Sequence, residues 1–422
     1  MMRTVRALEE KNGERCSLLG IGPMSRTVIR AAFTLAKEKD FPLMFIASRN
    51  QVDARELGGG YVCGWDQKAF VEAIGQLAAE TGFDGLYFIC RDHGGPWQRD
   101  NEREAGLAAE EAMNLGKRSY LEDLLAGFHL LHIDPTKDPH LKGVIPMDLV
   151  LERTVALIEH VEGERRKRNL PPVAYEVGTE ETSGGLTSEE AYASFIRKLT
   201  AVLSARDLPR PDFIVGQTGT LTRLTENVGR FDAATAARLS ATARAFGLGL
   251  KEHNADYLSD FILCYHPALG ITAANVAPEF GVVETESYLL LARLEADAYE
   301  KGFIKTKSRF AEAIAGQAAQ GGRWRKWMVG AEKDLSPEEV VKDARLADLV
   351  TRVSGHYHFE HEEIKAALSV LYRNLESLGI KPQDVVQNRI KQSIGRYVEC
   401  FNLAGLTGRI TGAAVPSAVN YS

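Results

Sequence analysis

The fold of this chain is decided by the stretch Leu86-Tyr87-Phe88-Ile89-Cys90-Arg91-Asp92-His93, a short apolar run that ends in residues able to bind metal ions or transfer protons. Six more runs end in the same way at nearly regular spacing. They are residues 43–47 before Asn50 and Gln51, 130–133 before Asp134, 173–177 before Glu180, 213–215 before Gln217, 248–250 before Lys251 and His253, and 271–274 before Asn275. This pattern predicts one site assembled from the ends of many parallel strands.

Segments with helical periodicity separate these runs. In residues 147–168, for example, Leu151, Val155, Ile158 and Val161 recur on one face, and charged residues fill the other. Helices are predicted at 25–39, 67–80, 104–125, 147–168, 188–205, 233–246, 257–263 and 284–301. With an opening apolar run at 16–20, the chain has eight strand-then-helix units. Eight units close a (β/α)8 TIM barrel, and an open doubly wound sheet is the alternative.

The alternation stops near residue 303. Helices are predicted at 308–320, 336–354, 361–378 and 382–403, and the break between the last two carries Gly379 and Pro382, which end and begin helices. We therefore predict a barrel over residues 1–303 and an all-helical C-terminal extension over residues 304–422. Residues 407–422 are rich in Gly, Ala and Ser and are expected to form a tail.

Composition excludes several functional classes. The 422 residues carry a net charge of −6, so the chain lacks the positive charge that attracts nucleic acids or anionic membranes. It has no apolar run of membrane-span length, and residues 1–15 are too charged for a signal peptide. Five scattered cysteines without a CxxC pair predict reduced thiols and no disulfide framework. We expect a cytoplasmic protein with no nucleic-acid partner.

Strand ends converge in the mouth of a barrel, so polar residues far apart in the sequence are expected to meet there. The set comprises Asp92, His93, Asp134, Glu180, Gln217 and His253. Two imidazoles, carboxylates and an amide suit Zn, Mn, Ni or Co and leave a position open for substrate. The alternatives are structural: His93 as a hydrogen-bonded core residue, and Asp92 as the cap of the next helix after a tight turn.

The turn after Asp92 and His93 contains Gly94 and Gly95, which would let backbone and ligand approach closely. On the next strand, alternation places His132 and Asp134 on one face, where polar side chains need a partner or a function. Asp134 is thus a second acid/base candidate. Glu176 shares the face of Glu180 and is interpreted as a satisfied core carboxylate.

Three further motifs give weaker evidence about function. Gly20-Ile21-Gly22-Pro23-Met24-Ser25 lacks the third glycine of a dinucleotide loop, and no acidic residue follows near Ala47, so nucleotide binding is not expected. The run Arg323-Trp324-Arg325-Lys326-Trp327 would suit a phosphate or a neighbouring subunit, but a half-buried helix face with basic tips is favoured. The histidines at 356, 358 and 361 lack the spacing of a helical metal site.

Several short motifs carry a family resemblance. They are Asn50-Gln51-Val52, Asp92-His93-Gly94-Gly95-Pro96, His132-Ile133-Asp134, Gly178-Thr179-Glu180, Gln217, His253 with Asp256-Tyr257, and Asn275-Val276-Ala277-Pro278. In this order they resemble the tagatose-bisphosphate aldolase non-catalytic subunit family over nearly the whole chain. The resemblance implies a class II aldolase-like barrel. Some members of this family resemble ketohexose or ketohexose 6-phosphate 4-epimerases. The sequence motifs at 92–97, 176–181 and 323–327 are similar to those of this epimerase group.

The chain departs from class II aldolases at two places. Gln217 stands where they carry a metal histidine, and Asn254-Ala255-Asp256 replaces their glycine-rich phosphate loop. A non-phosphorylated ketose such as fructose or tagatose is therefore a candidate substrate, beside the 6-phosphates.

We hypothesise that a divalent metal is held by His93, Glu180, Gln217 and His253. Asp92 or Asp134 then removes the C4 hydroxyl proton, and retro-aldol cleavage, rotation of the aldehyde and re-addition invert C4. Direct deprotonation at C4 is difficult because this carbon is not adjacent to the C2 carbonyl. The expected substrate-binding residues are Asn50, Gln51, Trp97, His132, Lys251 and Asn275.

Three alternatives stay open at this stage. The chain could be a non-catalytic partner whose C-terminal helices dock an aldolase catalytic subunit; assembly as a homo-oligomer is a separate possibility. It could also be a class I aldolase that uses Lys251 as a Schiff base. Oxidation at C4 by NAD is the most distant, since a cofactor loop is lacking.

Overall fold

The computed structural model describes residues 2–179 and 185–412. Eight parallel strands close into a barrel in the order β1-β10-β9-β6-β5-β4-β3-β2, which confirms the TIM barrel and excludes the open sheet. The strands are β1 (Leu18–Ile21), β2 (Leu43–Ser48), β3 (Tyr87–Gly94), β4 (Leu130–Ile133), β5 (Ala174–Val177), β6 (Phe213–Val215), β9 (Gly249–Glu252) and β10 (Ile271–Val276). Each overlaps one of the predicted apolar runs, because strands enclosed on both faces read as continuous apolar segments.

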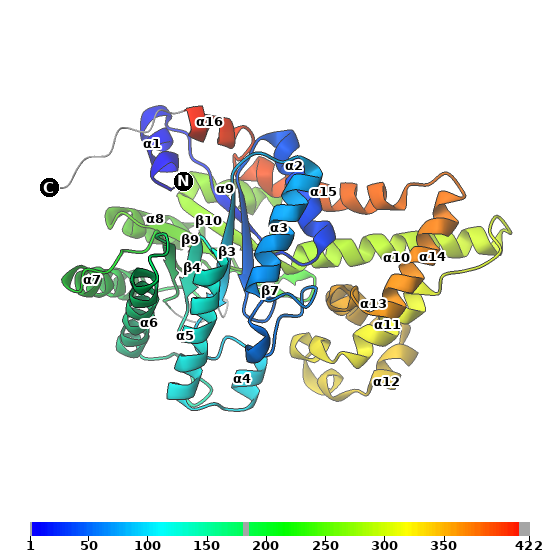
Figure 1. The fold of residues 1–422 in the computed structure, drawn as a ribbon, viewed down its shortest axis with the longest axis horizontal. Coiled ribbons are helices and arrows are strands. Elements are labelled where there is room, and N and C mark those ends of the chain that lie inside the picture. The colour runs from blue at the N-terminus through cyan, green and yellow to red at the C-terminus, as the bar shows by residue number, and fades with distance from the viewer. Residues whose placement is uncertain (1, 180–184, 413–422) are drawn as a thin grey trace.

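Helices surround the barrel (Figure 1). They are α2 (Arg26–Lys39), α3 (Gln67–Thr81), α5 (Ala109–Ala126), α6 (Met147–Lys167), α7 (Glu189–Ala205), α8 (Ala233–Ala245), α9 (Asp260–Leu269) and α10 (Pro278–Glu300). The start of α2 shows how local sequence sets such an element. The Ser25 hydroxyl accepts a hydrogen bond from the Val28 N–H, and the apolar face that includes Ile29 and Leu35 is buried.

Four predicted helices have different bounds in the structure. The helix predicted at 104–125 corresponds to α5. A separate short helix, α4 (Asp100–Glu104), ends just before Gly106, which adopts a φ of 57°. The helix predicted at 257–263 begins only after its cap, Ser259. The helix predicted at 284–301 already begins at Pro278, whose fixed φ suits the first turn. Residues 336–354 divide at Asp343, whose carboxylate caps the second half.

The extension is helical throughout the part that is described, as predicted. It contains α11 (Phe310–Gln320), α12 (Pro337–Lys342), α13 (Ala344–Ser354), α14 (Glu362–Glu376), α15 (Pro382–Cys400) and α16 (Leu406–Gly412), with the 3-10 turns η2 (Arg323–Trp327), η3 (Gly330–Asp334) and η4 (Gly355–His358). Residues 406–412 form a helix rather than the start of a tail, and the rest of the predicted tail lies outside the described residues. The basic run at 323–327, predicted as a half-buried helix face, is a 3-10 turn.

Figure 1 shows how the extension meets the barrel. The long helix α10 continues away from the barrel, α11 to α14 gather along its outer part, and α15 returns to pack on α2, α9 and α10. Side chains of α14 and α15 such as Leu371, Ile390 and Ile394 belong to the same hydrophobic core as the barrel. The division at residue 303 remains a prediction about sequence organisation.

The glycine motif in β1 has a packing role. Gly20 lies beside Asn275 of β10, and a Cβ on Gly20 would come within 2.3 Å of the Asn275 Oδ1. The missing side chain lets a polar residue enter the barrel interior. No helix within the described ranges combines the length and apolar character required to cross a lipid bilayer.

Candidate active site

A pocket of about 270 Å³ opens at the carboxyl ends of the strands. Its volume lies near the lower end of the range for small-molecule sites. Six predicted site residues line it, namely Asn50, Gln51, Asp92, His93, His253 and Asn275. The convergence expected from strand ends is therefore present for residues from β2, β3, β9 and β10.

His93 and His253 each direct one ring nitrogen toward the other inside this pocket. The Nε2 of His93 lies 3.1 Å from the Nδ1 of His253. The opposite nitrogen of each ring contacts a carboxylate: His93 Nδ1 lies 2.6 Å from Asp134 Oδ2, and His253 Nε2 lies 2.7 Å from Glu176 Oε1. When each carboxylate accepts an N–H, the two facing nitrogens both present lone pairs, which repel unless a proton or a metal ion lies between them.

Asp92 completes this convergence. Its Oδ1 lies 3.6 Å from His253 Nδ1 and 4.0 Å from His93 Nε2, and it accepts a hydrogen bond of 3.0 Å from Asn275 Nδ2. Burial alone would raise the pKa of Asp92, but the neighbouring histidines hold this pKa below its usual range. The carboxylate is therefore ionised at neutral pH and able to accept a proton or a cation. α4 begins at Asp100, so Asp92 is not the helix cap of the structural alternative.

His132 lies behind this group. Its Nδ1 accepts the backbone N–H of His93 at 3.1 Å and lies 3.8 Å from Asp92 Oδ1. Asp92, His93, His132 and His253 each offer one ligand atom, and these atoms lie within 4.8 Å of one another. His132 is not among the described residues that line the pocket. It contacts Asp92 and the other histidines rather than the open space of the pocket.

The donor set fits a divalent metal. Zinc–nitrogen bonds of about 2.0–2.1 Å place two tetrahedral ligand nitrogens roughly 3.3 Å apart, close to the observed spacing of the His93 and His253 nitrogens. The carboxylate on the far side of each ring is the usual support of a metal-binding histidine. His93 also has a φ of 42°, a strained conformation for a residue with a side chain, which is typical of functional sites.

Asp134 supports His93 rather than facing the open pocket. It is buried, contacts the His93 Nδ1, and accepts the N–H of Thr136. Burial would raise its pKa, but the hydrogen bond to His93 and the charge of that ring hold the pKa below its usual range. Its predicted acid/base role would thus operate through His93.

Glu176 supports His253 in the same way. The sequence interpretation of a satisfied core carboxylate is confirmed, since its second oxygen lies 2.5 Å from the Nζ of Lys251. The contact to His253 was not foreseen. Its only sequence signal was the inward-facing position of Glu176 two residues before Gly178. Burial opposes ionisation of Glu176, but Lys251 and the nearby histidines lower its pKa to about 2.

Three further predicted site residues do not line the pocket, and a fourth is not described. Lys251 is buried in its ion pair with Glu176. Trp97 is fully buried and donates its indole N–H to the Leu107 carbonyl, and the next residue, Gln98, lines the pocket instead. Gln217 follows β6, is nearly buried, and donates its backbone N–H to the Thr187 hydroxyl. Glu180 lies outside the described residues.

The glycines after His93 have a packing role. A Cβ on Gly94 would come within 2.5 Å of the ring of Tyr120, and Gly95 adopts a φ of 113°. The Tyr120 hydroxyl donates to the His132 carbonyl, so this close approach fixes β3 against β4. Close ligand approach at these glycines stays a prediction.

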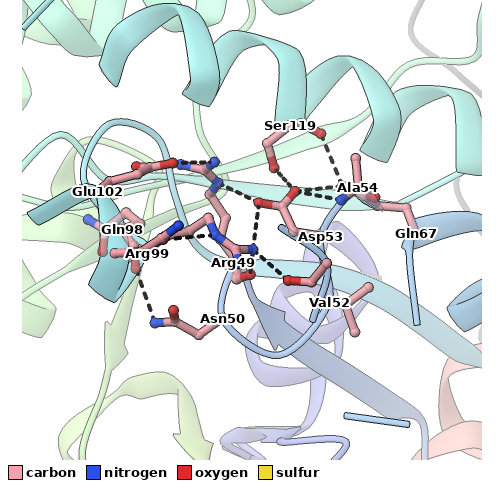
Figure 2. A network of polar contacts seen from close by, with 12 residues as sticks. Arg49, Asn50, Val52, Asp53, Ala54, Gln67, Gln98, Arg99, Glu102 and Ser119 are labelled. Carbon is pink, nitrogen blue, oxygen red and sulfur yellow. Dashed lines mark hydrogen bonds and ion pairs between the residues drawn. The ribbon is translucent and has the colours of Figure 1, made fainter. Parts of the chain in front are cut away.

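A buried polar network holds the loops that carry Asn50 and Gln98 (Figure 2). Arg49 lies 3.0 Å from Asp53 and 2.7 Å from Glu102, and its Nη1 donates to the Gly95 carbonyl. Asp53 also accepts hydrogen bonds from Gln67 and Ser119. Removing one partner of such a pair leaves an uncompensated buried charge, which costs about 3–5 kcal/mol. These partners join distant segments, so periodicity in the sequence does not indicate them.

Several pocket residues were not predicted. Lys137 follows β4, Tyr61 precedes α3, and Arg323, Lys326 and Tyr357 come from the extension. The basic run at 323–327 was interpreted as a half-buried helix face, and the structure corrects this: two of its cations and Trp327 line the pocket. Its alternation of basic and aromatic residues was the available signal.

Comparison with known proteins agrees with this architecture. The model of the D-tagatose-1,6-bisphosphate aldolase subunit GatZ/KbaZ-like family matches residues 3–400. Comparison with curated proteins found no significant match.

Solved structures with this fold include three sugar-related proteins. A probable tagatose 6 phosphate kinase from Sinorhizobium meliloti 1021 superimposes with a TM-score of 0.73 at 20% identity, covering 91% of this chain and 100% of that one. The fructuronate-tagaturonate epimerase UxaE from Cohnella laeviribosi gives 0.53 at 12% identity over 95% and 86%. A fructose-bisphosphate aldolase from Campylobacter jejuni gives 0.50 at 11% identity over 96% and 94%. At these identities the likeness is one of fold.

Proposed function

Because this chain belongs to the D-tagatose-1,6-bisphosphate aldolase subunit GatZ/KbaZ-like family, we propose that it acts on ketohexoses or their 6-phosphates as a metal-dependent 4-epimerase. The reaction would interconvert fructose and tagatose forms. One observation carries the proposal: the lone pairs of His93 and His253 and the carboxylate of Asp92 converge inside an open pocket. A chain that served only as a docking partner would not need such a set.

A divalent ion would be held by His93 and His253, with Asp92 and His132 beside them. Glu180 and Gln217 stay predicted as further ligands. Such an ion, whether Zn, Mn, Ni or Co, polarises ketose oxygens and lowers the barrier to charge development. Asp134 and Glu176 would keep the two rings in the tautomers that this role requires.

Asp92 would perform the proton transfers. Its carboxylate takes the proton of the C4 hydroxyl, the C3–C4 bond breaks, and its electron pair moves toward C2, giving an enediolate of carbons 1–3 and an aldehyde of carbons 4–6. The aldehyde rotates and presents its other face to C3. The bond re-forms, and Asp92 returns its proton to the new C4 oxygen, so that only the configuration at C4 has changed.

Other pocket residues would position the substrate. Asn275 donates to Asp92 and keeps its carboxylate directed at the histidines. Asn50, Gln51 and Gln98 place amide groups along the pocket wall, where they suit the hydroxyl groups of a sugar. The aldehyde must rotate without leaving, which a pocket of this modest volume favours.

The second candidate is an accessory subunit of a tagatose-1,6-bisphosphate aldolase, a role that the word "subunit" in the family description favours. The chain would then bind an aldolase catalytic subunit and show no turnover alone. The class I alternative has less support, because Lys251 is buried in an ion pair with Glu176. A homo-oligomer is compatible with either of the first two roles.

The test is to incubate the purified chain, before and after EDTA treatment, with fructose, tagatose and their 6-phosphates, and to separate ketoses and trioses by chromatography. A 4-epimerase interconverts the ketoses without releasing triose, loses activity with EDTA, and regains it with added metal. Triose release would indicate an aldolase. Absence of turnover from every substrate and metal would favour the accessory subunit.

A further inference from the structure

Three cations that the proposed reaction does not use lie in the same pocket as His93 and His253. They are Lys137, Arg323 and Lys326. Asp100 lies beside them, with its Oδ2 3.5 Å from Arg323 Nη2 and 3.8 Å from Lys326 Nζ. A fourth cation, Arg103, pairs with the other oxygen of Asp100. Asp100 therefore contacts three cations, Arg103, Arg323 and Lys326.

Asp100 does not saturate the hydrogen-bond donors of Arg323 and Lys326. Charge-assisted hydrogen bonds between N–H and carboxylate span about 2.7–2.9 Å, shorter than either contact of Asp100 to Arg323 or Lys326. Within the described part of the chain, the buried Nε of Arg323 has no hydrogen-bond partner. Burial lowers the pKa of Lys326 to about 8, and Arg323, Lys137 and Arg103 add to this effect while Asp100 opposes it. Arg323 and Lys326 thus keep donor capacity beyond their contacts with Asp100.

The position of Arg323 is fixed before any ligand arrives. Its guanidinium carbon lies 4.5 Å from the ring centre of Tyr61 and 4.7 Å from that of Tyr357. Two aromatic rings cover the guanidinium, so hydrogen bonds are left to its N–H edge. A planar donor edge held in this way matches the paired oxygens of a phosphate or a carboxylate.

We propose that Arg323, Lys326 and Lys137 form a subsite for the anionic end of an open-chain sugar whose reacting carbons lie at Asp92, His93 and His253. The anion is a phosphate monoester or a carboxylate, two groups with the same paired-oxygen chemistry. This inference rests on the proposed function and narrows it, because it selects ketose phosphates or ketohexuronates over neutral ketoses. It also makes the extension a wall of the site, since Arg323 and Lys326 both belong to η2.

The test uses the full chain loaded with divalent metal and measures binding by isothermal titration calorimetry. The probes are fructose, fructose 6-phosphate, fructuronate and inorganic phosphate. The variants are Lys326→Gln and Lys137→Gln, with Lys326→Arg to restore the charge. Arg325→Gln is the matched control, because Arg325 belongs to the same turn but hydrogen-bonds to the Lys333 carbonyl instead of lining the pocket.

We expect the wild type to bind at least one anionic sugar roughly tenfold or more tightly than fructose, and each Gln variant to lose most of that difference. The Lys326→Arg variant should retain part of this binding, and Arg325→Gln should leave it unchanged. Tighter binding of fructose 6-phosphate and inorganic phosphate identifies a phosphate subsite, and tighter binding of fructuronate identifies a carboxylate subsite. Equal binding of all three sugars, or no effect of Lys326→Gln, would overturn the proposal.

The subsite and the reaction can fail separately. If fructose 6-phosphate binds through Lys326 but its C4 is never inverted, the subsite stands and the epimerase proposal fails. If fructose and fructose 6-phosphate are inverted with equal kcat/KM, the reaction stands and the subsite is refuted.

Discussion

At the scale of single residues, two identical side chains acquire their chemistry from the carboxylates behind them. His93 and His253 each hydrogen-bond to a buried acid, Asp134 or Glu176, and turn the remaining nitrogen into the pocket. Neither acid lines the pocket itself. Their effect is to fix which ring nitrogen carries the proton and thereby to leave a lone pair on the other.

Asp92→Asn is expected to reduce turnover by about 10³-fold or more, the scale of a lost acid/base group, because an amide cannot take up the C4 hydroxyl proton. His93 and His253 remain, so bound metal should stay close to the wild-type amount. The measurement is kcat together with metal content by mass spectrometry. Turnover near the wild-type value would remove Asp92 from the proton-transfer role.

Glu176→Gln is expected to weaken metal binding by about 10–100-fold, because an amide holds the tautomer and basicity of His253 less well than a carboxylate. Affinity would be measured by competition with a chromophoric chelator. Glu252→Gln is the matched control: Glu252 is another buried acid at the end of a barrel strand, but it bonds Thr218, Thr220 and His266. Equal losses in both variants would show a general effect on folding.

Binding of fructose 6-phosphate should depend on pH through Lys326. Its pKa of about 8 means that affinity declines as pH rises above this value, and the phosphate loses a charge below its second pKa of about 6. The strongest binding is expected between these limits. Asp100, Arg103, Arg323 and Lys137 also face Lys326, and Tyr357 stays protonated because burial raises its pKa.

Titration calorimetry across a range of about pH 5–10 tests this dependence, with Lys326→Arg as the control. Arginine stays charged throughout that range, so the alkaline decline should disappear in the variant. A decline of the same size in both proteins would assign it to a different group.

At the scale of elements, α10 links the barrel to the extension and carries a buried acid against the start of α2. The Ser25 hydroxyl, which caps α2, donates to Glu284 Oε2 at 2.6 Å, and Tyr288 contacts the other oxygen. Burial raises the pKa of Glu284, and the hydrogen bonds with Ser25 and Tyr288 lower it. Burial has the larger effect, so the pKa is about 7. The folded protein therefore holds this proton more tightly than the unfolded chain does.

As pH rises, the Glu284→Gln variant should consequently gain stability relative to the wild type. In the wild type, the unfolded chain releases the proton near pH 4.5 and the folded protein only near pH 7, so stability falls across this interval by about 3 kcal/mol. The amide does not ionise. The difference in thermal midpoint between variant and wild type, measured from about pH 5 to 8, should shift in favour of the variant, and a constant difference would contradict the expectation.

At the scale of the whole molecule, the extension and the barrel share one hydrophobic core. Ile390, Ile394, Tyr397 and Val398 of α15 are fully buried and belong to the core cluster that also contains the barrel strands. Arg323 and Tyr357 reach the pocket from the same extension. The residues after 303 thus contribute to stability and to the site together.

A chain that ends at residue 303 should therefore not form a stable barrel. Each large apolar side chain of α15 contributes about 1.5–3 kcal/mol by burial, and removing α15 exposes the faces of α2 and α10 that it covers. The measurement is the soluble yield and thermal unfolding of the shortened chain beside the full chain. Cooperative unfolding at the same midpoint would show that the barrel folds independently.

The sequence alone determined the barrel, the helical extension and the strand ends that carry Asp92, His93, His253 and Asn275. These features follow from local periodicity and from chain connectivity, which place the ends of parallel strands at one mouth. The helix bounds were less well predicted where a cap or a glycine between two similar segments decided them, as at Gly106 and Asp343.

Only the tertiary structure decided which side chains meet. It paired Glu176 with His253, placed Trp97 in the core, and brought Arg323 and Lys326 of the extension to the pocket that Asp92 and His93 also line. The physical reason is that periodicity reports which face of an element is buried, whereas hydrogen bonds and ion pairs depend on distances between elements. Those distances are set when the whole core packs, and no local pattern encodes them.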